Sequence, residues 1–139
     1  VANGAWRALK PGGRFVGEFG GRGNIQKIVT AIENALAARN VIIASPWHFP
    51  DTDEFRAVLE SAGFVVKHLE LFARPTPLPA DLETWLGTFA KTWLAALPVA
   101  EQQPFMNEVS AELRGDLCDA HGKWTIDHVR LRFIATKPV

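Results

Sequence analysis

The sequence predicts an α/β domain in which a short apolar strand lies inside a larger sheet. Residues 10–13 read Lys-Pro-Gly-Gly, which fits a type II turn because proline fixes φ at the second position and glycine allows a positive φ at the third. Phe15, Val16 and Phe19 follow as an apolar run, typical of a strand covered on both faces. Such a strand needs neighbours on both sides, yet few residues precede it and no initiator methionine is present. We therefore expect the chain to be the second half of a larger α/β domain.

The first half of the chain predicts a strand between two helices. One helix ends at about Leu9, the strand covers residues 14–19, and residues 20–23 form a loop. The next helix has an apolar stripe at helical spacing, and Asn24 is its expected N-cap. That stripe consists of Ile25, Ile28, Val29, Ile32 and Leu36. Residues 41–44 are apolar, but a Ser-Pro pair follows at once, so we expect a connector there.

A capping-box pattern at residues 51–54 (Asp-Thr-Asp-Glu) opens the next predicted helix. Gly63 ends this helix in a left-handed conformation, and the second strand covers residues 64–72. The alternation of the strand is imperfect around Lys67 and His68, so part of it is expected to face solvent. The residues that the helix is expected to bury are Phe55, Val58, Leu59 and Ala62.

Two further helices and a strand complete the predicted elements. The third helix covers residues 81–97, and the fourth covers residues 100–114, with Gly115 as its stop. The last strand covers residues 125–136 and alternates well. One broad face of the third helix carries Leu82, Trp85, Leu86, Phe89, Trp93 and Leu97. The last strand places Val129, Leu131, Phe133 and Ala135 on one face and His128, Arg130 and Arg132 on the other.

The composition predicts a protein that stays in the cytoplasm and binds neither nucleic acid nor a membrane. Hydrophobic residues make up 47% of the 139 residues, which is enough for a core, and one domain is the default at this length. Fifteen basic and fifteen acidic residues give a formal charge of zero, without a basic stripe. The apolar runs are too short to span a bilayer. A single cysteine fits a reducing compartment.

Several motifs together give a specific family resemblance. The segment WRALKPGGRFVGEFGG, at residues 6–21, resembles the late helix, turn and fifth strand of class I S-adenosylmethionine (SAM)-dependent methyltransferases. With the later motifs, nearly the whole chain resembles the C-terminal half of the trans-aconitate methyltransferase-like branch. These motifs are PWHFP at residues 46–50, SAGF at 61–64, LFARPTPL at 71–78, WT at 124–125 and RLRF at 130–133. The glycine-rich SAM loop of the family, and the acidic residue that ends its second strand, have no counterpart here.

The resemblance implies the C-terminal part of a Rossmann-like methyltransferase fold, incomplete without its N-terminal half. It implies a three-stranded sheet segment in the order first, third, second strand, with the last two strands antiparallel and about four helices. Residues 75–123 would form a helical cap over the substrate. The full-length enzyme would use SAM on a small-molecule substrate, whereas this chain alone would bind no cofactor and be inactive. The free edge of the first strand would be an apolar ladder, which favours self-association through that edge.

Arg22, within the glycine-rich loop at residues 20–23, is the first candidate substrate-binding residue. The loop lacks the spacing of a dinucleotide fingerprint, so a flexible loop that leaves the sheet is the simpler interpretation. The resemblance nevertheless implies a position beside the substrate pocket, where the Arg22 guanidinium would suit a carboxylate. Because ligands of open α/β sheets lie at the carboxyl ends of strands, Phe19 and Trp47 are also expected close to the site.

Aromatic residues supply the remaining candidates. Trp47 and His48 stand between prolines, where they would either wall a pocket or cover the sheet edge, and we leave both interpretations open. Trp85 belongs to an aromatic helical stripe that is more typical of a core, but it lies within the expected cap.

No residue is assigned a catalytic role. Methyl transfer depends mainly on aligning the acceptor, and a carboxylate acceptor, which the resemblance implies, needs no general base. A hydroxyl acceptor would need one, and Glu18 and His48 are the candidates. The histidine and cysteine spacings do not suggest a metal site. Two alternatives remain: a non-catalytic module for dimerisation or complementation, and a nucleotide-binding fragment that uses residues 20–23.

Overall fold

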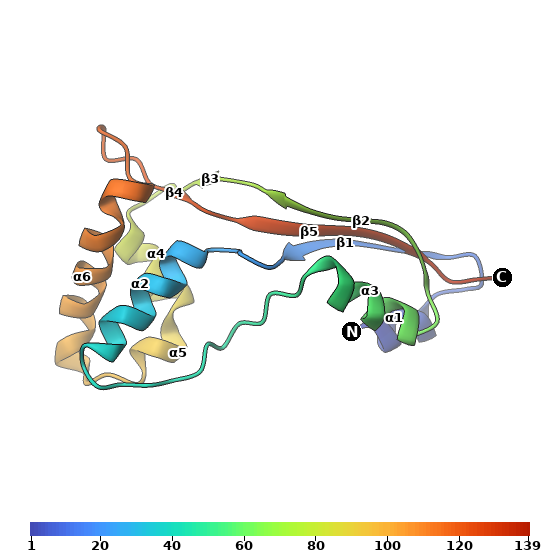
Figure 1. Cartoon of the computed structure of the whole chain (residues 1–139), viewed down its shortest axis with the longest axis horizontal. Coiled ribbons are helices and arrows are strands. Elements are labelled where there is room, and N and C mark those ends of the chain that lie inside the picture. Colours follow the sequence, from blue (N-terminus) through green and yellow to red (C-terminus); the bar gives the residue numbers. More distant parts are fainter. The chain divides into compact units, whose positions relative to one another are not determined.

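The computed structural model describes residues 1–139 and contains six helices and five strands (Figure 1). The chain divides into two compact units. The first consists of Val1–Asn24, Phe49–Arg74 and His128–Val139, and the second of Ile25–His48 and Pro75–Asp127. No helix combines the length and the apolar character that a membrane span requires.

A three-stranded antiparallel sheet forms the centre of the first unit. Its strands are β1 (Arg14–Gly20), β2 (Val65–Ala73) and β5 (Val129–Thr136), in the order β1-β5-β2. The predicted strand order and the antiparallel pairing of the last two strands are therefore confirmed. A register shift in β2 between Val66 and His68 explains the imperfect alternation of its sequence, because the intervening residue has no partner in β5.

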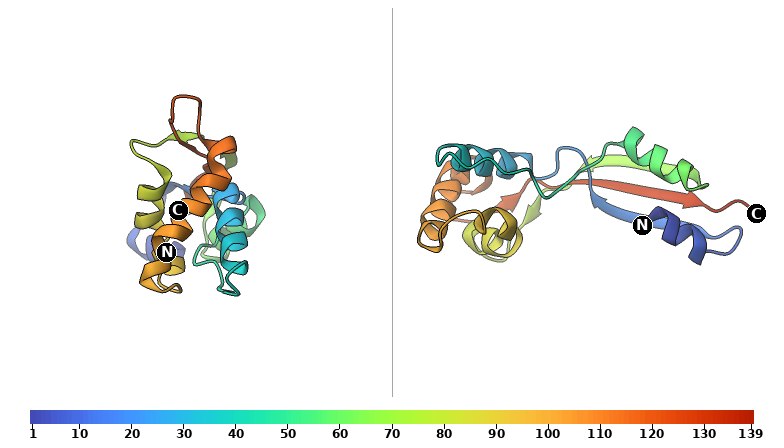
Figure 2. Two further views of the ribbon diagram at one scale, coloured as in Figure 1. Left: turned by 90° about the vertical axis from the view of Figure 1, so that its left-hand side faces the viewer. Right: turned by 90° about the horizontal axis from the view of Figure 1, so that it is seen from below.

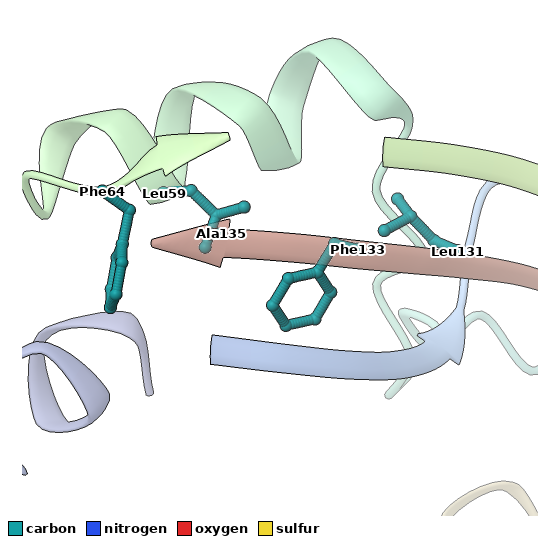
Figure 3. Close-up of a cluster of buried hydrophobic side chains, with 5 residues drawn as sticks. All are labelled: Leu59, Phe64, Leu131, Phe133 and Ala135. Carbon is teal, nitrogen blue, oxygen red and sulfur yellow. The ribbon is translucent and has the colours of Figure 1, made fainter. Parts of the chain in front are cut away.

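Helices α1 (Ala2–Ala8) and α3 (Thr52–Ser61) cover one face of this sheet. The buried core between helices and sheet is made of Leu59, Phe64, Leu131, Phe133 and Ala135 (Figure 3). The Trp6 ring of α1 meets the Phe64 ring edge-on, with centroids 5.1 Å apart. No helix of this unit covers the opposite face, where 56% of Val16 is exposed.

Local signals in the sequence correctly predict the turn before β1 and both caps of α3. Gly12 has φ +81°, and the Gly13 N–H donates to the Lys10 carbonyl at 2.9 Å, as a type II turn requires. The Asp51 side chain accepts from the backbone N–H of Glu54, and the Glu54 side chain accepts from the N–H of Asp51, so the capping box is complete. The capping glycine that ends α3 has φ +99°.

Three predictions about this region are wrong in detail. Val58 is half exposed rather than buried, because α3 turns only the side of Leu59 fully inward. The strand predicted at residues 125–136 is two strands, since β4 (Thr125–Ile126) and β5 pair with different partners. Asn24 does not cap the following helix; its side-chain oxygen accepts the Val129 N–H at 2.8 Å.

The second unit is a helical assembly joined to a two-stranded ladder. It contains α2 (Gln26–Ala37), α4 (Leu82–Phe89), α5 (Lys91–Leu94) and α6 (Val99–Leu117). Strand β3 (Thr76–Pro77) pairs with β4. Figure 2 shows α6 running beside α2, and the two helices are in contact. The largest fully buried side chains of this unit are Trp93, Phe105, Ile28, Ile32, Leu36, Leu82, Leu86, Ile126 and Val109.

The helix boundaries of this unit differ from the prediction at three places. Helix α2 begins one residue after Ile25, which has φ +47° and is itself buried. The helix predicted at residues 81–97 divides at Ala90 into α4 and α5, which helps to raise the number of helices from about four to six. Gly115 does not stop α6, which continues to Leu117. Residues 41–44 form no strand, as expected for a connector.

Candidate functional site

A carboxylate surrounded by three arginines lies at one end of the sheet in the first unit. Strands β1 and β2 end there and β5 begins. One oxygen of Glu18 (Oε1) accepts from Arg74 Nη1 at 2.6 Å and from Arg130 Nε at 3.3 Å. The other (Oε2) accepts from Arg132 Nε at 3.0 Å and Nη2 at 2.8 Å. This end of a sheet is where ligands of open α/β folds bind.

These contacts set the acidity of Glu18. The hydrogen bonds from Arg132, and then those from Arg74 with its positive charge, lower the pKa of Glu18, although desolvation opposes part of the shift. A carboxylate with a lowered pKa and several guanidinium donors is a weak proton acceptor at neutral pH. The geometry therefore argues against Glu18 as the general base that a hydroxyl acceptor would need, and favours a role in holding the three arginines together.

Arg22 already has a carboxylate partner within the chain. Its Nη1 lies 2.9 Å from Oδ2 of Asp51, and its backbone N–H donates to the Pro50 carbonyl at 3.0 Å. The Arg22 side chain is 65% exposed, so solvent screens this ion pair and a ligand carboxylate would compete with Asp51 for the same guanidinium.

Close packing explains Gly21 in the neighbouring loop. A Cβ atom at Gly21 would collide with a Leu71 methyl carbon. The backbone N–H groups of Gly21, Arg22 and Asn24 donate to the carbonyls of Val129, Pro50 and Gly21. A phosphate-binding loop needs such N–H groups for its anion, so these bonds argue against a nucleotide site at residues 20–23.

Phe19 lies on the helix-covered face of the sheet. Its ring meets the rings of Phe55 and Phe133, with centroids 4.8 and 6.2 Å away. Phe19 therefore packs against the core of the first unit, and its contact with a substrate stays a prediction.

The aromatic candidates of the second unit lie together. The Trp47 ring meets the Trp93 ring at 4.8 Å and the Trp85 ring at 6.3 Å, and Trp85 meets Phe89 at 5.1 Å. Trp93 is fully buried and Trp85 partly so, whereas His48 is exposed. The structure thus brings Trp47 and Trp85 together, while Phe19 and Arg22 belong to the first unit.

Trp85 and Phe89 also line a pocket with a volume of about 320 Å³. Its wall is formed by Thr76, Pro77, Leu78, Pro79, Ala80, Asp81, Thr84, Trp85, Thr88 and Phe89. The wall is mostly apolar, and its size falls within the range of small-molecule sites. The aromatic stripe was recognisable from its helical spacing, but the sequence alone did not show that Phe89 is 56% exposed.

The arginine cluster was not predicted from the sequence. Arg130 and Arg132 share one face of an alternating strand, which is visible in the sequence. Their convergence on Glu18 depends on the register that pairs Glu18 with Arg132 across β1 and β5. Arg74 joins them because it directly follows β2.

Comparisons with known proteins find similarity to proteins that are named methyltransferases. No family model matches the chain. It is 37% identical over 142 residues to an uncharacterized methyltransferase of Schizosaccharomyces pombe, an alignment that covers 99% of this chain and 54% of that protein. It also shares the fold of part of a candidate methyltransferase from Bacillus halodurans, with a TM-score of 0.52 and 14% identity over 99% of this chain and 57% of that one. The chain thus spans about half the length of the relatives it matches.

A further solved structure shows a weaker similarity. Phosphoethanolamine N-methyltransferase 2 of Haemonchus contortus, in complex with phosphomonomethylethanolamine and S-adenosylhomocysteine, matches with a TM-score of 0.38 and 15% identity. The match covers 99% of this chain and 29% of that structure.

Proposed function

We propose that this chain is the substrate-side part of a SAM-dependent methyltransferase that acts on a small molecule. The observation that carries the proposal is the 37% identity to a methyltransferase along 99% of the chain. The fold shared with part of a second methyltransferase supports it. The chain would follow the SAM-binding half of the enzyme, and membership of the trans-aconitate-like branch is the finer prediction.

The residues of this chain do not fit a cofactor site of their own. The glycine-rich loop uses the N–H groups of Gly21, Arg22 and Asn24 for bonds to carbonyls of the same chain. We therefore assign SAM binding to residues outside this chain. SAM, when bound, supplies an electrophilic methyl group, so the part played by this chain would be to hold the acceptor and exclude water.

The proposed substrate-side residues are Arg22, Trp47, His48 and Trp85, with Phe19 supporting the strand end from the core. Trp47 and Trp85 have ring contacts with each other, and Trp85 lines the pocket of the second unit. These contacts support a binding role for the aromatic pair in particular.

Calorimetric titration with SAM tests whether the cofactor site lies outside residues 1–139. We expect no measurable SAM binding to residues 1–139. A longer natural product of the same gene should bind SAM and transfer its methyl group to small-molecule acceptors. A micromolar dissociation constant for SAM with residues 1–139 alone would contradict the assignment of the cofactor site.

A non-catalytic module for dimerisation or complementation is the second candidate. The observation that favours it is that β1 is an edge strand of the sheet and that its residue Val16 is half exposed. Self-association without methyl transfer by any longer product would support this alternative.

A further inference from the structure

Helix α4 has two chemically different sides. Leu82 and Leu86 are fully buried and attach the helix to the core of the second unit. Asp81, Trp85 and Phe89 follow one another at intervals of four residues, so they lie along a single stripe of the helix. All three residues of this stripe line the 320 Å³ pocket.

Contacts between aromatic rings hold the wall of the pocket in place. The rings of Trp85 and Phe89 lie 5.1 Å apart with an interplanar angle of 38°. Trp47 contacts the Trp85 ring, and the buried Trp93 ring contacts Trp47 in turn. Pro77, Leu78 and Pro79 complete the apolar lining. Two aromatic rings in the wall of a mostly apolar pocket can pack against a flat apolar group.

Asp81 gives the pocket a negative charge. Its Oδ1 accepts the backbone N–H of Thr84 at 2.8 Å and the Thr84 hydroxyl at 2.7 Å. These hydrogen bonds lower the pKa of Asp81, so the carboxylate is ionised at neutral pH. No lysine, arginine or histidine lines the pocket. The dipole of α4 contributes only about half a positive charge at this end, less than the full negative charge of Asp81.

From the pocket lining we propose that this site binds a small organic cation, an ammonium group carried on a flat apolar body. The aromatic rings of Trp85 and Phe89 supply π systems that attract such a cation, and the Asp81 carboxylate complements its charge. A carboxylate ligand would instead meet a like charge without a basic partner. As an acceptor site, the pocket rests on the proposed methyltransferase function and would take an amine in place of the carboxylate acceptor that the trans-aconitate-like resemblance implies. Ligand binding itself is measurable without catalysis.

Three probes of similar shape test the charge preference: phenethylamine, 2-phenylethanol and hydrocinnamate. Binding to residues 1–139 is followed by NMR through the indole N–H signal of Trp85. We expect phenethylamine to bind about tenfold more tightly than the neutral alcohol, which is the gain expected from a partly exposed cation–π contact plus one ion pair. Hydrocinnamate should bind more weakly than the alcohol. Equal affinities for the amine and the alcohol would overturn the proposal.

Two variants and a matched control assign the effect to the pocket. Asp81→Asn removes the charge but retains a good N-cap, so it should abolish the preference for the amine while α4 stays folded. Phe89→Ala removes a half-exposed ring and should weaken amine binding by about fivefold. Glu83→Gln removes a charge from the same helical turn outside the pocket lining, so the preference should persist within about twofold.

The outcomes separate this proposal from the proposed function. An unchanged amine preference in Asp81→Asn, with circular dichroism like that of the parent, would overturn the cation site. Methyl transfer by a longer product together with loss of the cation preference would leave the methyltransferase proposal intact. Conversely, selective amine binding by residues 1–139, together with no methyl transfer by a longer product that folds, would leave the cation site standing and contradict the enzyme.

Discussion

At the scale of single residues, the strand register between β1 and β5 brings Glu18 together with its arginine partners. The pairing of β1 with β5 places Glu18 opposite Arg132, and Arg130 is two residues away on the same face. Three guanidinium groups around one carboxylate leave an excess of positive charge. The carboxylate therefore reduces repulsion among the arginines at the end of the sheet.

The first prediction concerns the pH dependence of this cluster. Because the pKa of Glu18 is lowered from its ordinary value of 4.5, its stabilising contribution is complete well above that pH and is lost as the pH falls through the lowered value. Glu18→Gln should therefore lower the urea midpoint at pH 7, and the difference from the parent should shrink towards about pH 3. A difference that stays constant over this range would contradict the assigned role.

The second prediction concerns the close packing of Gly17. A Cβ atom there would lie 2.7 Å from the Phe133 ring, which is buried and in contact with the rings of Phe15, Phe19 and Phe55. Gly17→Ala should destabilise the chain by about 1–3 kcal/mol through overpacking. Gly115→Ala is the control, because a Cβ added there inside α6 would meet no atom within 4 Å, and it should stabilise by about 0.5–1 kcal/mol. Urea denaturation measures both, and equal effects would contradict the packing argument.

Sequence motifs predicted the local structure correctly where that structure depends only on residues nearby in the sequence. The type II turn and the capping box depend on neighbours within four residues, and both are confirmed. Asn24 was assigned to the helix after it, but its side chain bonds to Val129, which is distant in sequence. A contact between residues so far apart produces no periodic pattern in the sequence, so the sequence alone could not identify it.

At the scale of elements, α3 depends on its first turn. Asp51 caps the helix and also pairs with Arg22, so one side chain connects the helix to the loop that follows β1. Leu59 is the only residue of α3 that is fully buried, and most of the remaining helix faces solvent. Local capping should therefore contribute a large share of its stability.

The third prediction separates the two roles of Asp51. Asp51→Ala removes both the cap and the ion pair and should cost about 1 kcal/mol, within a range of about 0.5–2. Asp51→Asn keeps a favourable cap and loses the charge, so its cost should be smaller, because an exposed ion pair is weak. Thermal or urea unfolding measures both variants. An equal loss in the two would mean that the ion pair dominates.

Element boundaries were harder to predict than the elements themselves. All three long strands and the main helices appear where the patterns predicted them, because hydrophobic periodicity extends over many residues. The break at Ala90 has no proline or glycine to mark it. Gly115 suggested a helix end, but a glycine inside a helix costs only about 1 kcal/mol, which the packing of Leu113 and Leu117 can offset.

At the scale of the whole molecule, the edge of β1 is the feature to test. The strand pairs with β5 on one side only, and the Val16 side chain within it is 56% exposed. An apolar edge of this kind favours pairing with another strand.

The fourth prediction follows from that edge. Sedimentation velocity of residues 1–139 should show an average mass that rises with concentration, from about 10 to 200 µM, and Val16→Lys should reduce this association. The substitution keeps the strand and adds a charge that opposes pairing. A monodisperse monomer throughout, with fast hydrogen exchange from Phe15 to Phe19, would contradict pairing through β1.

Methyl transfer from SAM by a longer product that contains residues 1–139 tests the central claim most directly. With a labelled methyl group, we expect the label in a small-molecule product, and none when residues 1–139 are supplied alone. A longer product that folds but neither binds SAM nor transfers its methyl group would contradict the account.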